Sequence, residues 1–131
     1  MKEKAARISS SELEVLKILW TAEDGMSFSE IRGHMKHISK WKSSTIKTLL
    51  RRLNEKEIVA VEKKAVYYYR ALISETEYNE FATLNLVNQL YAGSARSLVA
   101  SLVNSNKLNK DDIEELRAIL DRAGDKNDSD T

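Results

Sequence analysis

Residues 41–54 constrain this chain more than any other stretch, because helical spacing sorts them into an apolar face and a basic face. Ile46, Leu49, Leu50 and Leu53 recur at the interval of one helix side. A helix on a domain surface usually mixes acids and bases at i+4 spacing, which stabilises it. The opposite face here carries only hydroxyls and cations, and such a face can lie in the major groove of DNA. Its residues are Ser44, Thr45, Lys47, Thr48, Arg51 and Arg52.

Helix starts in the first half of the chain are marked by capping boxes, in which a serine is followed three residues later by a glutamate. They predict one helix that ends near Ala22 and a second that ends near His37. Ser43 or Ser44 is the predicted N-cap of a third helix over residues 44–54. Three short helices, the third of them basic, favour a helix–turn–helix arrangement. The boxes are Ser9/Glu12, Ser11/Glu14 and Ser27/Glu30.

The composition becomes β-prone after Glu57. Residues 58–61 and 66–70 are rich in β-branched and aromatic side chains, and a basic segment, residues 62–65, separates them. Residues 59–72 are therefore predicted to form a two-stranded hairpin with a basic tip, the wing of a winged helix. The turn lacks the glycine or asparagine that tight hairpin turns prefer.

The second half of the chain predicts three more helices and a polar tail. The first of these helices spans about four to five turns and stops at Gly93. The last is expected to end near Gly124, and residues 124–131 are expected to be disordered. The predicted capping residues are Ser74 (with Glu77), Ser94 and Asn109.

The chain divides into a basic part and an acidic part. Residues 1–73 carry 15 basic and 9 acidic side chains, whereas residues 74–131 carry 6 and 11. One lobe that faces nucleic acid and a second lobe with another task account for this asymmetry. We expect a winged-helix DNA-binding domain over residues 1–73, a helical dimerisation domain over 74–123 and a disordered tail over 124–131.

The second lobe is predicted to pair with a second copy of the chain. Three helices of about 50 residues form a marginal core alone, so their apolar stripes favour a partner surface. The alternative is a monomer in which these helices fold back on the first lobe. Two-fold symmetry would give a helix–turn–helix protein a palindromic register. The interface is expected to include Phe81, Leu84, Leu90, Tyr91, Leu98, Val99, Leu102, Ile113, Leu116 and Leu120.

The predicted fold class is mainly α with a small antiparallel β wing. It combines a winged helix–turn–helix with a C-terminal helical dimerisation lobe. The chain has no cysteine, which excludes disulfides and thiolate metal sites. It has no apolar run of about 18 residues and no basic-then-apolar leader, so we expect a cytoplasmic protein without membrane contact. No cofactor is expected.

Catalysis and metal binding are the weaker alternatives. No nucleophile elbow, phosphate loop or HExxH helix is present, which argues against an enzyme. Glu30, His34 and His37 form an i, i+4, i+7 trio, but lysines surround them and exposed histidines are more often plain surface residues. The acids of residues 111–115 open a predicted helix, where they favour the helix dipole. No catalytic residue and no metal ligand is predicted.

Three segments resemble the penicillinase-repressor family. They are Glu-Leu-Glu-Val-Leu-Lys-Ile-Leu-Trp at residues 12–20, Trp-Lys-Ser-Ser-Thr-Ile-Lys-Thr-Leu-Leu-Arg-Arg-Leu at 41–53, and Tyr-Tyr-Tyr-Arg-Ala-Leu-Ile-Ser-Glu at 67–75. The first two strings are specific in combination, and the similarity spans roughly residues 8–122. The resemblance implies a homodimeric winged-helix repressor on a palindromic promoter operator, a double-stranded DNA site with TACA/TGTA-type half-sites.

The resemblance also implies roles for single residues. Positions 44, 45 and 47 match residues that approach bases, and positions 48, 51 and 52 match residues near phosphates. Lys47 is the best candidate for reading a base, because a cation near the helix start can reach guanine O6 and N7; a plain phosphate contact is the alternative. The two wing lysines would meet adjacent phosphates. The whole set expected at DNA is Lys42, Ser43, Ser44, Thr45, Lys47, Thr48, Arg51, Arg52, Lys63 and Lys64.

The chain departs from the family where induction is concerned. Copper-responsive members end in a cysteine cluster, which this chain lacks, so copper sensing by that route is excluded. Members that respond to β-lactams are cut at an Asn-Phe bond that aligns with Ser101-Leu102, so cleavage there is unsupported. The expected partner that relieves repression is a protease of another specificity or a sensor. Glu57 replaces a common glycine, and Ala65-Val66 replaces Gly-Arg in the wing.

The competing function is a winged-helix module that binds a protein partner and not DNA, since a fold does not fix a function. A helix that docks on a protein is expected to expose an apolar or aromatic anchor. The exposed positions within residues 42–52 carry cations and hydroxyls instead, which favours DNA.

Overall fold

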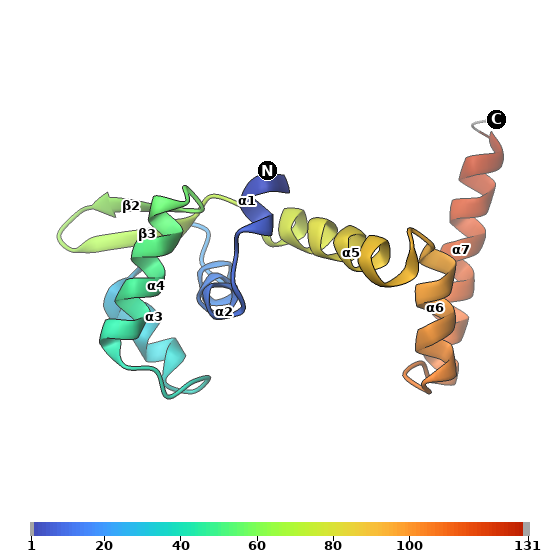
Figure 1. Cartoon of the computed structure of the whole chain (residues 1–131), viewed down its shortest axis with the longest axis horizontal. Coiled ribbons are helices and arrows are strands. Elements are labelled where there is room, and N and C mark those ends of the chain that lie inside the picture. The colour runs from blue at the N-terminus through green and yellow to red at the C-terminus, as the bar shows by residue number, and fades with distance from the viewer. Residues whose placement is uncertain (1, 130–131) are drawn as a thin grey trace. The chain divides into compact units, whose positions relative to one another are not determined.

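Seven helices and three strands make up residues 2–129, the part of the chain that the computed structural model describes (Figure 1). By contacts the chain falls into two units, residues 1–84 and 85–131. The helices are α1 (Lys2–Ala6), α2 (Ser10–Leu19), α3 (Phe28–Met35), α4 (Ser43–Glu55), α5 (Glu75–Tyr91), α6 (Ala95–Asn104) and α7 (Lys110–Ser129). The strands are β1 (Met26–Ser27), β2 (Val59–Lys63) and β3 (Tyr67–Ala71).

The predicted capping boxes start most of the helices. At α2 the Glu12 amide donates to Ser9 Oγ over 3.2 Å, and the Ser9 amide donates to Glu12 Oε1 over 2.8 Å. Equivalent pairs of bonds form at α3, α5 and α7, and Ser94 accepts from the Ser97 amide at α6. The Ser11/Glu14 box does not form, because Ser11 lies inside α2. Helices α2 and α3 end at Leu19 and Met35, slightly before the predicted ends.

The start of α4 differs from the prediction. Its N-cap is Lys42, which makes no side-chain capping bond, and Ser43 is already helical. The stability of α4 therefore comes from its packing and not from a cap. Ile46, Leu49, Leu50 and Leu53 are at most 5% exposed, and they face the same core as α2. A deep apolar stripe outweighs a missing cap, which is worth only about 1 kcal/mol.

The sheet is three-stranded and antiparallel, in the order β1-β3-β2. The wing hairpin runs in register from Val59 opposite Ala71 to Lys63 opposite Tyr67. Strand β1 was not predicted, because two residues are too short for a periodic pattern; it pairs Met26 with Tyr69. Gly25 precedes it at φ 96°, where an added Cβ would lie 2.9 Å from the Tyr69 carbonyl oxygen, so this turn requires glycine.

The core of the first unit gathers apolar side chains from α1 to α4, β1, β2 and the segment before α5. Tyr78 and Phe81 of α5 pack against it, and the Trp20 indole donates to the Ile73 carbonyl oxygen over 2.8 Å. The Trp20 and Tyr78 rings are 5.9 Å apart. These contacts explain why the unit boundary falls within α5, at Leu84, and not between residues 73 and 74.

Helix α4 ends in a Schellman motif at Glu57. The Ile58 amide donates to the Leu53 carbonyl oxygen over 2.9 Å, and the Glu57 amide donates to that of Asn54 over 3.0 Å. Ile58 and Leu53 are both 0% exposed, which supplies the hydrophobic contact of the motif. Glu57 itself has φ 62°, a left-handed conformation that favours glycine. The left-handed backbone at this position explains why glycine is common there in the resembled family.

We expect Glu57→Gly to stabilise the first unit by about 1 kcal/mol, because it removes the strain of a non-glycine residue in the left-handed region. The substitution gives up only an ion pair with Lys4 at 3.7 Å, which is solvent-exposed. Urea unfolding measures the change. Glu55→Gly is the control, and it should destabilise because residue 55 is helical. A loss of stability in Glu57→Gly would contradict the strain argument.

The second unit has little core of its own. Among its described side chains only Val87 is buried. Helix α7 runs through Gly124 to Ser129, so the predicted helix end near Gly124 is corrected; residues 130–131 lie outside the described residues. A single interior glycine costs about 1 kcal/mol and does not stop a helix. Within the described part of the chain, no helix is long and apolar enough to cross a membrane.

Candidate nucleic-acid interface

The outward face of α4 presents the cations and hydroxyls that the sequence placed there. Lys42, Ser44, Thr45, Lys47, Arg51 and Arg52 are exposed, and Ser43 and Thr48 are half-buried. The apolar stripe of α4 is buried in the core, and this packing holds the helix in one rotational orientation. The opposite face therefore points away from the core. The face contains no carboxylate until Glu55 in the last turn.

Some of these side chains already have partners within the protomer. The Lys47 ammonium lies 5.0 Å from the centroid of the Phe28 ring, a cation–π contact that holds it beside α3. The Thr48 hydroxyl donates to the Ser44 carbonyl oxygen over 2.9 Å, and Arg51 lies 3.4 Å from Glu55. The remaining side chains of the face have no such partner among the described residues, and they are open to a ligand: Lys42, Ser44, Thr45 and Arg52.

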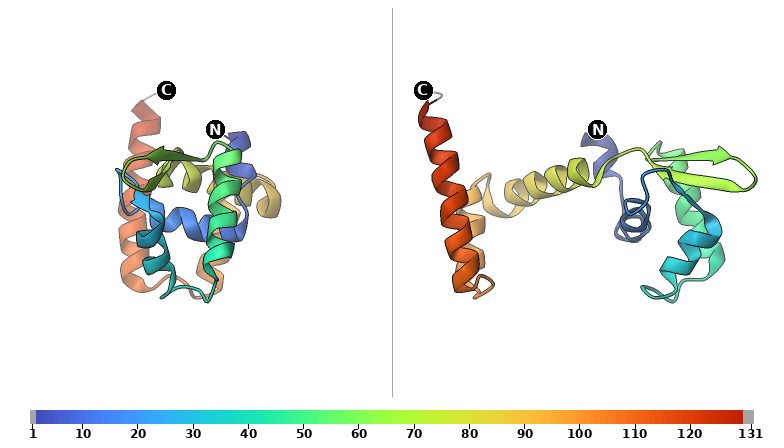
Figure 2. Two further views of the ribbon diagram at one scale, coloured as in Figure 1. Left: turned by 90° about the vertical axis from the view of Figure 1, so that its left-hand side faces the viewer. Right: turned by 180° about the vertical axis from the view of Figure 1, so that it is seen from behind.

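The wing forms without glycine at its tip. The Lys64 amide donates to the Val66 carbonyl oxygen over 3.0 Å, and none of the turn residues has a positive φ. The Lys64 ammonium lies 5.1 Å from the centroid of the Tyr68 ring, and Lys63 is exposed. The wing thus presents two cations in the first unit that also carries α4 (Figure 2). The Ala65-Val66 departure from the family leaves the hairpin intact.

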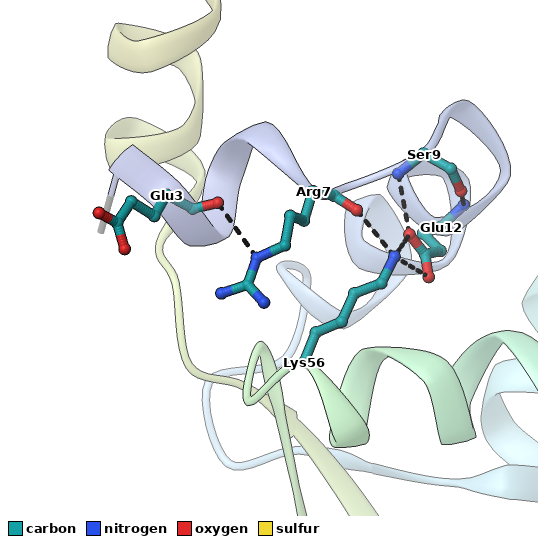
Figure 3. A network of polar contacts seen from close by, with 5 residues as sticks. All are labelled: Glu3, Arg7, Ser9, Glu12 and Lys56. Atoms are coloured by element: carbon teal, nitrogen blue, oxygen red, sulfur yellow. Dashed lines mark hydrogen bonds and ion pairs between the residues drawn. The ribbon is translucent and has the colours of Figure 1, made fainter.

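An ion pair between half-buried Lys56 and buried Glu12 ties the end of α4 to the start of α2, and the sequence analysis did not predict it (Figure 3). Lys56 Nζ donates to both carboxylate oxygens of Glu12, at 2.7 and 2.9 Å, and to the Arg7 carbonyl oxygen at 2.7 Å. Glu12 is only 1% exposed. Burial raises the pKa of Glu12, but the hydrogen bonds from Lys56 and Ser9 and the Lys56 charge outweigh it, so this pKa is lowered. Glu12 therefore stays ionised inside the fold.

The pair could not be found by spacing, because its members lie 44 residues apart. From the sequence alone, Glu12 is interpreted as a capping residue, and it does cap α2 with Ser9. Lys56 is interpreted as one more cation on the surface. The sequence offered one signal of a buried charge: Glu12 lies on the side of an amphipathic helix that faces the core.

The apolar positions predicted for dimerisation are mostly uncovered in the protomer. Leu90 is 66% exposed, Leu120 61% and Leu84 58%, and Val99 and Leu102 are also exposed. Tyr91, Leu98, Ile113 and Leu116 are half-buried, as is Phe81, which packs against the core of the first unit. Three further apolar side chains are exposed that the predicted dimer interface did not include: Leu86, Val103 and Ile119.

The alternative sites gain no geometric support. In the described residues, no three acidic or histidine side chains are placed to share a metal ion. Glu30 accepts from the Ser27 amide and hydroxyl, so its carboxylate serves the cap of α3 and not the two histidines. Asp112 likewise caps α7 with Asn109.

Three short helices and a β wing around one core, with a basic helix on the outside, define a winged helix–turn–helix protein. The family model described as penicillinase repressor matches residues 8–122. The chain therefore belongs to the penicillinase-repressor family, a family of transcriptional repressors and not of enzymes. The predicted family, the mainly α fold with a winged helix–turn–helix, and the assignment to a non-enzymatic family are confirmed.

Individual relatives agree with this assignment. The methicillin resistance regulatory protein MecI of Staphylococcus aureus (strain N315) is 33% identical over 93% of this chain and 99% of its own length. The penicillinase repressor of Bacillus licheniformis is 31% identical over 91% of this chain and 93% of its own. The solution structure of the DNA-binding domain of the repressor BlaI matches 55% of this chain and 88% of that one, with 33% identity and a TM-score of 0.50.

Proposed function

We propose that this protein represses transcription as a homodimer that binds a palindromic promoter operator and excludes the polymerase. The observation that carries the proposal is the acid-free outward face of α4, which is fixed by a buried stripe and accompanied by the basic wing. Cations and hydroxyls on one helix face suit phosphates and base edges of the major groove. In the resembled family the half-sites are of the TACA/TGTA type, and we expect them here about one or two helical turns apart.

The dimer is supported by the second unit. Its helices α5, α6 and α7 expose several leucines and valines and one isoleucine, whereas only one described side chain of the unit is buried. An exposed apolar surface of this kind usually marks an interaction site. A second copy of the same chain offers the same surface, and a two-fold axis satisfies both copies at once. Since promoter DNA lies in the cytoplasm, we place the protein there.

The competing proposal, a module that docks on a protein, finds less support. The exposed face of α4 carries no aromatic or large apolar side chain, and Trp41 before it is half-buried against the core. Interface anchors are usually aromatic residues or arginines in well-packed pockets. A basic, hydroxyl-rich helix suits DNA better.

A duplex with two half-sites tests the dimeric mode of binding directly. Two protomers should bind it cooperatively, and a duplex with one half-site should lose at least about tenfold in affinity through lost bivalency. Analytical ultracentrifugation of the complexes gives the stoichiometry. Equal affinity for both duplexes, with one protomer on each, would contradict the dimeric repressor.

Lys47→Ala should weaken operator binding by about 1–3 kcal/mol and relax preference at one base pair, if the ammonium leaves Phe28 for a guanine. The cation–π contact keeps Lys47 near the interface in the free protein, so little ordering is needed. Binding to operator and to variants of each base pair measures the effect. An equal fall in specific and non-specific affinity would reduce Lys47 to a phosphate contact. Lys17→Ala, on α2, is the control.

Replacing Lys63 and Lys64 by Ala should lower the slope of log K against log salt by about 4 for the dimer, because each of the two protomers loses two phosphate contacts and each contact contributes roughly one released counterion. The preferred sequence should stay the same, since phosphate contacts carry no base information. A salt series on operator and non-operator duplexes separates the two effects. A changed site preference would overturn the phosphate role of the wing.

The signal that relieves repression involves a second protein in our proposal, either a protease or a sensor. The bond aligned with the family's cleavage site, Ser101-Leu102, lies in the last turns of α6, and both residues are exposed. Helical backbone must unwind before a protease can cut it, so a cut elsewhere or a non-proteolytic release fits this chain better.

A further inference from the structure

The basic surface extends beyond the recognition helix. Residues 31–54 hold seven Lys and Arg and no Asp or Glu, and they include both histidines of the chain. Outside α4, this segment covers the second half of α3 and the turn after it. In the left view of Figure 2, α3, α4 and the wing are seen together on the side of the first unit that faces the viewer. The exposed basic and histidine residues of this extension are Arg32, His34, Lys36, His37 and Lys40.

The side chains of this extension have no partner within the described residues. None of the five forms a hydrogen bond or an ion pair there, and no carboxylate lies within 4.0 Å of either imidazole. Glu30 is the nearest acid in sequence, and its carboxylate is held by the α3 cap. The extension is therefore a group of cationic side chains and histidines with no ion-pair partner among the described residues of the first unit.

The elements that pack on α3 do not supply a neutralising charge either. Helix α2, β1 and β3 contact α3. On α2, Glu12 is bound to Lys56, and Glu14 is paired with Lys17 at 3.3 Å. Strand β1 carries no charge, and Arg70 of β3 pairs with Glu62 at 3.7 Å. Among the described charged groups, cations therefore dominate the surroundings of the two histidines: Arg32, Lys36 and Lys40.

We propose that four side chains of this extension, His34, Lys36, His37 and Lys40, bind DNA phosphates beside the major groove, and that His34 and His37 take up protons when they do. The inference rests on the proposed function, because it names further contacts of the same DNA interface. In helix–turn–helix complexes the helix before the recognition helix crosses the DNA backbone, which brings phosphates to the position of α3. Phosphate charge reverses the surrounding potential and favours the imidazolium form.

Proton uptake makes operator affinity depend on pH. Histidine is the side chain whose charge ordinarily changes between pH 5 and 8, and this chain has only two. Each proton taken up on binding raises the affinity by as much as tenfold per pH unit as the pH falls. The histidines of the two protomers should together strengthen binding by at least about tenfold between pH 7.5 and 6.0.

The test measures the dissociation constant of an operator duplex from pH 5.8 to 8.0 at constant ionic strength. The wild type is compared with His34→Gln/His37→Gln, which keeps size and polarity but cannot be protonated. Both positions are exposed, so the fold should be unaffected, and circular dichroism checks it. The double variant should bind like the wild type at pH 8.0 and should lose the gain at pH 6.0. Lys36→Gln/Lys40→Gln should lower the salt slope of the dimer by about 4 at either pH, because two cations are lost from each protomer.

The outcomes separate this inference from the proposed function. A flat pH profile for the wild type, or the same profile in the double histidine variant, would overturn the inference while specific binding at pH 8.0 still supports the repressor. An unchanged salt slope in the Lys36→Gln/Lys40→Gln variant would show that these two lysines do not contact DNA phosphates. Absence of specific binding at every pH would overturn the proposed function and the inference with it.

Discussion

Leu90→Asp/Leu120→Asp should convert the protein into a monomer and reduce operator affinity by about 100-fold or more. Both leucines are more than 60% exposed in the protomer, so the substitutions remove little packing from the protomer itself. In the proposed dimer each aspartate would be buried without a partner charge, and burial of an unpaired charge costs several kcal/mol. A monomer loses the effective concentration that links two half-sites, which is worth 10²–10⁴ in typical bivalent systems.

Sedimentation velocity and operator binding measure the two effects on one sample. Leu72→Asp is the matched control, because Leu72 is an exposed leucine of the first unit, at 43%, outside the proposed interface. The control should stay dimeric and bind the operator. A dimeric Leu90→Asp/Leu120→Asp variant would place the interface elsewhere. A monomeric variant with full operator affinity would show that dimerisation does not support repression.

Lys56→Met should destabilise the first unit by about 3 kcal/mol. Methionine replaces the aliphatic stem of Lys56 but leaves Glu12 ionised at 1% exposure with only the Ser9 amide as partner. Removal of one member of a buried ion pair costs far more than the pair contributes in its intact form. The Arg7 carbonyl oxygen also loses its donor, which loosens the link between α1 and α4.

Lys17→Met is the matched control for the surface. Lys17 pairs with Glu14 at 3.3 Å with both side chains partly exposed, so its loss should cost less than about 0.5 kcal/mol. Urea unfolding of both variants gives the difference. Similar small losses would show that Lys56 is not needed to hold the Glu12 charge.

The same ion pair predicts the acid sensitivity of the fold. The pKa of Glu12 is lowered in the folded state, so its carboxylate binds a proton more readily in the unfolded state than in the folded state. The stabilisation is fully present above the unfolded value near 4.5 and is lost as the pH falls below it, through the lowered folded pKa. The stability advantage of the wild type over Glu12→Gln should therefore shrink below pH 4.5. An advantage that is constant from pH 7 to pH 3 would contradict this.

Local patterns predicted the features of the fold that depend on neighbours in sequence. The amphipathic stripe of residues 46–53 located helix α4, and the Ser–Glu boxes located most helix starts. Glu57 stood out as a departure from a family glycine, and its left-handed backbone shows why the position matters.

The features that escaped prediction depend on distant residues or on very short elements. Strand β1 has two residues and exists only because Met26 meets Tyr69 of the wing. The Glu12–Lys56 pair needs the packing of α2 on α4 before it can form. The contact of Lys47 with Phe28 is of the same kind, because α3 must bring the ring to α4.

The proposed site was predicted as residue types on a face, and the structure adds which of those residues are engaged in the free protein. Thr48 and Arg51 are already bonded along α4, whereas Ser44, Thr45 and Arg52 are not. We expect the second group to gain more contacts on binding, since their hydrogen-bonding capacity is otherwise met by water.

The most direct test of the central claim is the affinity for a duplex with TACA/TGTA half-sites against a scrambled duplex, across a salt series from about 50 to 200 mM. Fluorescence anisotropy on the full chain measures both. The account predicts dimeric binding to the half-site duplex at least about 10³-fold tighter than to the scrambled one, with the preference kept as salt rises. Equal, weak binding to both duplexes that disappears with salt would contradict it and would favour a protein partner for the basic face.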